Sequence, residues 1–517
     1  MSRSARNLAG PRRAHAQQRG AALFLLLALV GVAAAGLLVT GLARLDLTGE
    51  RRRFNAQVLQ QAREALIAYA ITYPESSGKP YVPGHLPCPD LGTGSEGVAA
   101  STCGGRGVSA LGRLPWQTLG LPPLKDYDGH CLWYAVSGSF KTGTKPYLLN
   151  WDSPGQFAIR ASSGSVWLAG PDPNDLAAAV VFAPGPALAG QNRLASGSGE
   201  CGQDSDPSHF LDRVVLADGS AVDNAFLNPA IDGVTLLAQP DAGRDANDQL
   251  AWLQPRDLFG TAQAPRGIAR RGDFAAALYD PAYLRNGPSP ALAQRIADCL
   301  ASFAAGNAYR RLPWASPLAL TGTAPNTFEN DAFKDAAGLL AGRIPFHVWL
   351  SHQATGKSNA SPGLAACNGS ASASCRLLRT DNCPAGWDRV AGSPTAANSP
   401  DGWWDKWKDH FFYAVAPDFQ PAQAGNGTCT GNCLYVDGAG PYAALVIFAG
   451  RATAGQRRQT QAERNDPANY LGGTNAAALL NAQPGSAGFG RYSQASGNDR
   501  IVCIRRDLSL DLACTTP

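Results

Sequence analysis

The N-terminal segment constrains the fold of this chain more than any other feature. Five arginines and no acidic residue lie in the first 20 positions, and the stretch 21–43 that follows contains no charged residue. A helix needs roughly 20 apolar residues to cross the hydrocarbon core of a bilayer. The sequence therefore predicts a basic leader at 1–20 and a transmembrane helix at 21–43.

A helical pattern continues beyond this stretch. In the segment 44–75, apolar side chains recur at three- and four-residue spacing, including Phe54, Val58, Ala62 and Leu66. This is the spacing of one face of an α-helix. We therefore expect the helix to continue through 44–75 on the periplasmic side and to pack that face on a folded domain.

The leader and its junction resemble those of type IV prepilins and type II secretion pseudopilins. In that family a short basic leader ends in Gly, and the chain is cut after that Gly; here Gln17–Gly20 and Ala21–Leu25 fit the two sides of the junction. The resemblance implies that Gly20 and Ala21 are the processing site of a prepilin peptidase. It also implies that the N-terminal helix contacts membrane lipid and other pilin or pseudopilin subunits.

The fifth residue of the expected mature chain departs from the family pattern. Most members carry Glu there, which is thought to meet the N-terminal amine of a neighbouring subunit, whereas this chain has Leu25. A buried carboxylate without its partner is costly. The minor pseudopilins found at filament tips resemble this chain in lacking the Glu, which implies a subunit at the tip or initiating end.

Two other interpretations of the N-terminal segment remain open. An ordinary signal anchor would show the same charge bias and the same apolar run. A cleaved secretory signal would use the small residues Ala33–Ala35, although the apolar run continues past them. With an ordinary signal anchor, the alternative class is a membrane-anchored periplasmic enzyme or a ligand-binding envelope protein.

The length and the charge of the chain restrict its number of domains and its class of partner. A chain of 517 residues exceeds one ordinary hydrophobic core and suggests more than one domain. Because five of the 44 basic residues lie in the leader, the rest of the chain carries 39 basic and 40 acidic residues. This balance gives no basic stripe, so we expect no nucleic-acid partner.

The chain contains twelve cysteines, and together with a membrane-entry segment they indicate an oxidising compartment. No CxxC pair occurs, and the histidines do not cluster near the cysteines as the ligands of a zinc site would. Structural disulfides are therefore the favoured interpretation. The expected pairs, which close short loops, are Cys88–Cys103, Cys503–Cys514 and Cys429–Cys433.

Short sequence matches recur in the same order along the two halves of the chain, which indicates an internal duplication. Three of them are RLPW (113–116) with RIPF (343–346), CLWYAV (131–136) with FFYAV (411–415), and NDQLAWL (247–253) with NDRIVCI (498–504). We predict a first pilin-like head at 76–260, a linker at 261–272 and a second head at 273–517. The second head contains a loop insertion at 351–401.

Each predicted head opens with a helix and continues with short β-type runs bounded by Gly, Pro, Asn or Asp. This order predicts an α+β fold: a long N-terminal half-transmembrane helix followed by two tandem pilin-like heads, each a helix packed on an antiparallel sheet. The Trp-rich stretch 402–407 suits core packing better than sugar stacking.

The sequence contains few candidates for chemistry. Asp126 and Asp128 precede Gly129 as in calcium loops, but the later carboxylates of an EF-hand are missing, so they are a weak calcium candidate. No motif of a catalytic nucleophile, zinc protease or phosphate-binding loop occurs. We therefore expect no enzymatic activity and no cofactor.

Together these features predict a minor pilin-like or pseudopilin-like structural subunit, at the tip or initiating end of a type IV pilus or type II secretion pseudopilus. The expected location is the inner membrane, with a single pass, a cytoplasmic N-terminus and the bulk of the chain in the periplasm or on a surface filament.

Overall fold

The computed structural model describes residues 18–77, 84–142, 149–163, 166–193, 199–240, 246–259, 292–306, 310–320, 333–346, 348, 377, 407–421, 429, 432–486 and 488–515. The chain divides into two compact units, Met1–Gln57 and Val58–Pro517. All contacts described below lie within the second unit.

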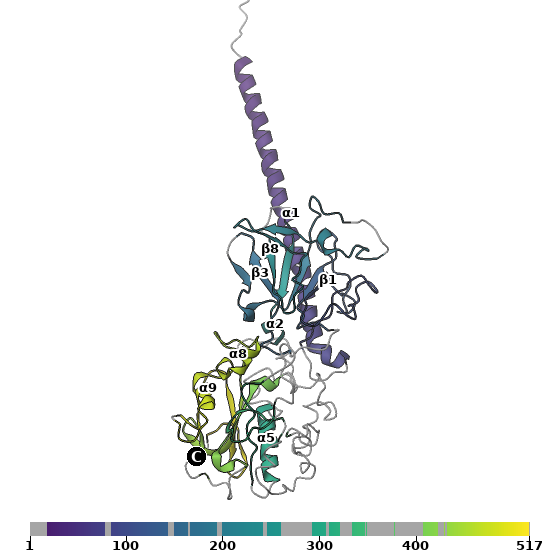
Figure 1. The fold of residues 1–517 in the computed structure, drawn as a ribbon. Coiled ribbons are helices and arrows are strands. Elements are labelled where there is room, and N and C mark those ends of the chain that lie inside the picture. Colours follow the sequence, from purple (N-terminus) through teal and green to yellow (C-terminus); the bar gives the residue numbers. More distant parts are fainter. Residues whose placement is uncertain are drawn as a thin grey trace, which may run out of the picture. The chain divides into compact units, whose positions relative to one another are not determined.

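Helix α1 (Gln18–Ser77) belongs to both units (Figure 1). Among the described residues, no helix combines the length and the apolar character that crossing a membrane requires. This finding overturns the predicted transmembrane helix at 21–43 and, with it, the predicted single-pass location in the inner membrane. The prediction depended on the length of an uncharged stretch, but a stretch without charge must also be sufficiently apolar to cross the bilayer core.

The first half of the second unit is built around an antiparallel sheet with strand order β1-β2-β5-β9. One face of this sheet packs against the C-terminal part of α1, where Leu59, Ala62, Leu66 and Ala70 are buried. Their spacing is that of one helix face. The strands are β1 (Ala110–Arg113), β2 (Trp133–Val136), β5 (Ala179–Ala183) and β9 (Gln249–Leu253).

The opposite face of this sheet packs against a second, smaller sheet with order β4-β3-β8. In it β3 and β8 run parallel, with Phe157 opposite Thr235. Its strands are β3 (Phe157–Ala161), β4 (Trp167–Ala169) and β8 (Thr235–Gln239). The flanking elements are η1 (Pro173–Asp175), η2 (Pro207–His209), the paired strands β6 (Arg213–Val215) and β7 (Ala221–Asp223), and α2 (Pro255–Phe259).

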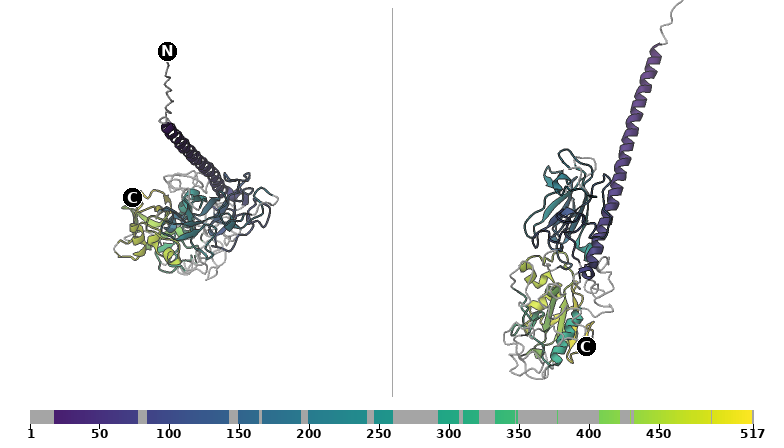
Figure 2. Two further views of the ribbon diagram at one scale, coloured as in Figure 1. Left: turned by 90° about the horizontal axis from the view of Figure 1, so that it is seen from above. Right: turned by 90° about the vertical axis from the view of Figure 1, so that its right-hand side faces the viewer.

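The second half has a sheet with order β10-β11-β13-β12-β14, in which β15 pairs with β13 and β16 with β15. Helix α5, labelled in Figure 1, packs against β13 and β15, and Figure 2 gives two further views of the chain. The strands are β10 (Ala341–Arg343), β11 (Phe411–Val415), β12 (Leu434–Val436), β13 (Ala439–Phe448), β14 (Arg491–Tyr492), β15 (Arg500–Arg505) and β16 (Leu510–Asp511). The helices are α5 (Leu292–Ala305), η7 (Lys408–His410), η8 (Pro417–Phe419), α8 (Gln461–Asn465), η9 (Pro467–Asn469) and α9 (Gly473–Leu480).

Four strands of each half occupy matching places, β1-β2-β5-β9 and β10-β11-β13-β15. Tyr134 is paired with Val181 in the first sheet, and Tyr413 with Val446 in the second. Leu253 is opposite Ala179 and Ile504 opposite Ala444. The matches read from the sequence therefore fall at equivalent positions of the two sheets.

The predicted fold class is wrong. Besides the missing membrane span, neither half is a helix laid on one purely antiparallel sheet, because β3 pairs in parallel with β8 and β12 with β14. Alternation along single strands carries no information on such pairings between segments that are distant in sequence. The head boundaries remain predictions, and the linker 261–272 and nearly all of the insertion 351–401 lie outside the described residues.

Candidate functional site

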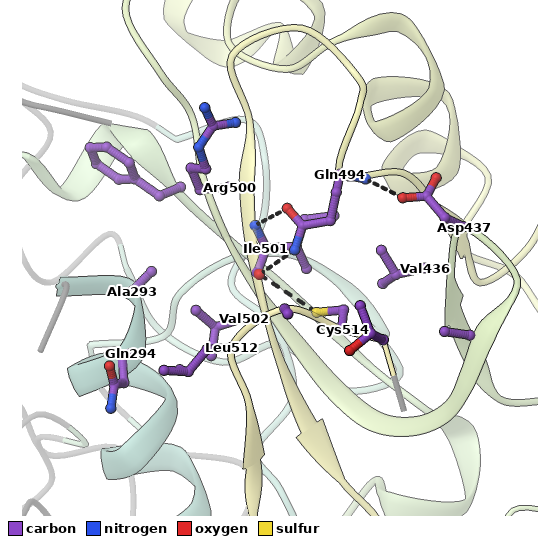
Figure 3. A pocket seen from close by; sticks show the side chains of 14 residues that line it. Ala293, Gln294, Val436, Asp437, Gln494, Arg500, Ile501, Val502, Leu512 and Cys514 are labelled. Atoms are coloured by element: carbon purple, nitrogen blue, oxygen red, sulfur yellow. Dashed lines mark hydrogen bonds between the residues drawn. The ribbon is translucent and has the colours of Figure 1, made fainter. Parts of the chain in front are cut away.

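A groove in the second half is a concave site formed by described residues. Its volume is about 750 Å³, within the range typical of ligand pockets. The floor is apolar, with Phe448 of β13, Ile501 and Val502 of β15, and Leu512 after β16 (Figure 3). Ala293, at the start of α5, forms one wall.

The polar rim of the groove includes a glutamine that completes the edge of β15. The Nε2 of Gln494 donates to the carbonyl of Ile501 at 2.7 Å, and its Oε1 accepts from the amide of Ile501 at 3.1 Å (Figure 3). The backbone amide of Gln494 donates to Asp437 Oδ2 at 3.0 Å. The side chain thus satisfies backbone groups that an edge strand would otherwise present to solvent.

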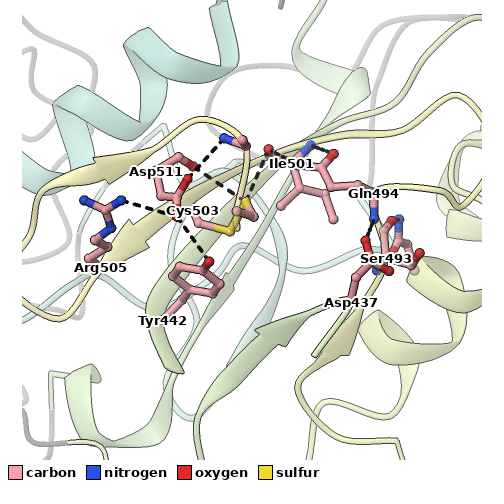
Figure 4. Close-up of a disulfide and its surroundings, with 11 residues drawn as sticks. Asp437, Tyr442, Ser493, Gln494, Ile501, Cys503, Arg505 and Asp511 are labelled. Carbon is pink, nitrogen blue, oxygen red and sulfur yellow. Dashed lines mark hydrogen bonds and ion pairs between the residues drawn. A yellow bond between two sulfur atoms is a disulfide. The ribbon is translucent and has the colours of Figure 1, made fainter. Parts of the chain in front are cut away.

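A disulfide fixes the far wall of the groove. Cys503 in β15 is bonded to Cys514, which brings the C-terminal residues 512–515 against the sheet (Figure 4). Asp511 accepts a hydrogen bond from the Tyr442 hydroxyl at 3.2 Å and pairs with Arg505 at 3.4 Å. These contacts hold the wall from both sides of the disulfide.

The groove is lined by few ionisable side chains, and this favours the binding of a ligand over proton transfer. Its lining includes one carboxylate, one guanidinium and one hydroxyl, those of Asp437, Arg500 and Thr515. Behind the rim, Asp499 is buried and accepts hydrogen bonds from the Gly472 amide at 2.9 Å and the Asn475 amide group at 2.8 Å. Burial raises the pKa of Asp499 to about 6.

All three expected disulfides are present: Cys88–Cys103, Cys429–Cys433 and Cys503–Cys514. The sequence did not reveal a further disulfide, Cys131–Cys201, whose cysteines are 70 residues apart. Only the fold brings these two together, since no local turn or loop links them in sequence.

Asp126 braces a turn. Its Oδ1 accepts from the amides of Asp128 and His130 at 3.0 and 2.8 Å, and its Oδ2 from the amide of Gly185 at 2.8 Å. Burial is the main cause that raises its pKa. Among the described residues, no group of three or more His, Cys, Asp or Glu side chains is placed to hold a metal ion.

The predicted processing site lies in α1, which includes Gly20 and Ala21. Cleavage between them, by a prepilin peptidase, stays a prediction.

Comparison with known proteins gives no family assignment: no family model, no curated protein and no solved structure matches this chain.

Proposed function

We propose that the protein is a structural subunit of the pilin-like or pseudopilin-like class. The observation that carries the proposal is the repetition of one four-strand sheet in two halves, each with a helix on one face and short disulfide-closed loops. Such an architecture supplies rigid, cross-linked bulk. A subunit that adds bulk to an assembly needs this more than it needs a solvent-accessible catalytic group.

The N-terminal sequence supports a minor subunit of such an assembly. The junction at Gly20 and Ala21 resembles that of processed subunits, and Leu25 stands where shaft subunits carry Glu. Two repeated halves in one chain also exceed the usual domain of about 100–150 residues. The end of a filament accommodates this bulk more easily than a packed shaft.

Processing tests the class. Produced together with a prepilin peptidase, the wild-type chain is expected to begin at Ala21, and Gly20→Trp to retain the leader. Gly31→Trp is the matched control, because a side chain added at Gly31 meets nothing within 4 Å, and it should be cut normally. Intact-protein mass spectrometry reads the outcome. A wild-type chain that keeps Met1–Gly20 beside an active peptidase would contradict the proposal.

Position in an assembly tests the minor role. Labelled protein should lie at one filament end in few copies, and Leu25→Glu should not improve incorporation. Even labelling along filaments, or better incorporation of Leu25→Glu, would favour an ordinary shaft subunit.

The groove of the second half favours a second candidate, a ligand-binding protein. Its apolar floor and polar rim are the usual features of a ligand site. Fluorescence of 8-anilinonaphthalene-1-sulfonate with the folded protein tests this, because a groove open to apolar ligands should bind the dye in saturable fashion. Absence of saturable binding would rule against this candidate and would leave the structural proposal untouched.

A further inference from the structure

One carboxylate of the first half is buried inside the second half. The Oδ2 of Asp152 accepts from His410 Nε2 at 2.7 Å and from Arg458 Nη1 at 2.5 Å, and its Oδ1 accepts from the amide of Ala452 at 2.9 Å. The three side chains are 5% exposed or less. All the donors lie between 258 and 306 residues further along the chain.

The neighbouring tryptophan enters the same site. The ring centroid of Trp151 lies 4.7 Å from that of Trp407 and 5.8 Å from that of Phe448. His410 also lies 5.1 Å from Trp407. Trp151 and Asp152 therefore complete an aromatic and ionic core whose other members belong to the second half.

The corresponding corner of the first half contains a carboxylate from the same half. Arg193 and Arg458 hold equivalent turns, since Arg193 donates to the Gly185 carbonyl at 2.5 Å and Arg458 to the Gly450 carbonyl at 2.9 Å. In the first half the nearby carboxylate, Asp126, comes from the same half. In the second half it is Asp152, from the other copy of the sheet.

Both protonatable partners are surrounded by charge. His410 faces Asp152, Arg458 and Asp409, and its ring also packs against Tyr470. Asp152 faces Arg458, His410 and Arg451. A cavity of about 20 Å³ beside Asp152, bounded by Arg451 and Ala452, has room for one water molecule.

We propose that Trp151 and Asp152 form a latch that holds the two halves together and that opens in acid. Separating Asp152 from Arg458 at neutral pH would leave a buried charge without compensation, which is strongly unfavourable. In acid the released His410 binds a proton that it binds less well when latched, and this difference in proton binding favours the open state.

The direction of the pH effect follows from the two pKa values. Burial lowers the pKa of His410 against the opposing effect of Asp152. Burial alone would raise the pKa of Asp152, but the charge of Arg458 and the hydrogen bond from His410 lower it overall. Both groups bind protons less well when latched, so acid favours opening. A released His has a pKa of about 6.5, so opening should become easier between pH 7.5 and 5.5, by at most about tenfold.

Hydrogen exchange of the full chain tests the latch, because the amide of Ala452 donates directly to Asp152. After correction for the intrinsic pH dependence, exchange of a peptide containing Ala452 should rise at pH 5.5, by at most about tenfold. A peptide from β13 should not follow. His410→Gln retains a donor but cannot be protonated, so its exchange should not depend on pH. Asp152→Asn should exchange faster at both pH values.

Asp172→Asn is the matched control. Asp172 also pairs across the two halves, with Arg457 at 2.5 Å, but that pair is about 40% exposed. This variant should behave as wild type. Equal protection of the wild-type Ala452 peptide at both pH values, or an effect of Asp172→Asn as large as that of Asp152→Asn, would overturn the proposal. If Asp152→Asn fails to fold, the comparison of wild type with His410→Gln still decides.

Discussion

The two halves of the chain build the same sheet and cover its second face differently. On the first face, α1 and α5 play the same part. On the second face, Trp133 packs against Phe210 at 5.2 Å beneath the β4-β3-β8 sheet, whereas the equivalent Phe412 packs against Tyr470 at 5.6 Å near α8 and α9. The repeated unit therefore consists of a helix and a sheet. The elements that cover the second face of the sheet differ between the two halves.

The largest expected effect tests the shared helix face. Leu66 in α1 and Leu300 in α5 are both fully buried. Leu66→Ala and Leu300→Ala should each lower the free energy of unfolding by about 2–5 kcal/mol, because each leaves a cavity in the core. Urea denaturation measures this. Leu480→Ala, at a position 60% exposed, is the control. A large loss in one half and none in the other would break the equivalence.

A smaller, pH-dependent effect compares two buried carboxylates, Asp248 and Asp499, which accept from Asn224 and Asn475 in the same way. Burial raises the pKa of Asp499 to about 6, against about 3.9 when unfolded, so the folded state binds more protons between these values. Its contribution to stability is therefore present at low pH and is lost as the pH rises through about 6. Asp499→Asn should lack this loss and be more stable at pH 7.5 by about 1–3 kcal/mol.

Asp248→Asn should show the same trend. Burial and the neighbouring Asp212 together raise the pKa of Asp248 well above its usual value. Thermal unfolding of the wild type and both variants between pH 4 and 8 provides the measurement. Stability curves of wild type and variants that stay parallel over this range would contradict the assignment.

An effect of about 1 kcal/mol is expected where a buried tyrosine hydroxyl is removed. Tyr134 donates to the Pro87 carbonyl at 3.2 Å and Tyr413 to the Pro313 carbonyl at 3.1 Å. Tyr134→Phe and Tyr413→Phe should lower stability equally in chemical denaturation, and Tyr127→Phe, at a more exposed position, should not. Unequal losses would show that the two corners differ in strength.

The smallest effect concerns the groove. Seven residues before Leu66 and Leu300 the two helices carry Leu59 and Ala293, and the smaller side chain borders the groove. Ala293→Leu should fill part of it, raising stability by less than about 1 kcal/mol and weakening dye binding. Unchanged dye binding would place the ligand elsewhere.

The sequence allowed individual strands to be predicted, because β-type runs such as those at Trp133–Val136 and Phe411–Val415 form strands β2 and β11. The short disulfides were predictable for a similar reason, since Cys88 and Cys503 each close a local loop. The prediction of a membrane span was wrong, since no helix among the described residues has the required length and apolar character.

The features that were not predicted from the sequence depend on contacts between segments that are distant in sequence. The parallel pairing of β3 with β8, the disulfide Cys131–Cys201 and the burial of Asp152 have no signature within any short window. The groove was also missed, because it arises from the start of α5 and from the tail that Cys514 pins in place. Periodicity reports which face of an element is buried, but not which element covers it.

The large sequence separation between Asp152 and its partners also affects the synthesis of the chain. Arg458 is added 306 residues after Asp152, which at roughly 5–20 residues per second takes about 15–60 s on the ribosome. During that interval Trp151 lacks the aromatic neighbours that later surround it. In a nascent chain that stalls between the two halves, Trp151 therefore stays without these neighbours. Chaperones or proteases can then recognise the chain as incompletely folded.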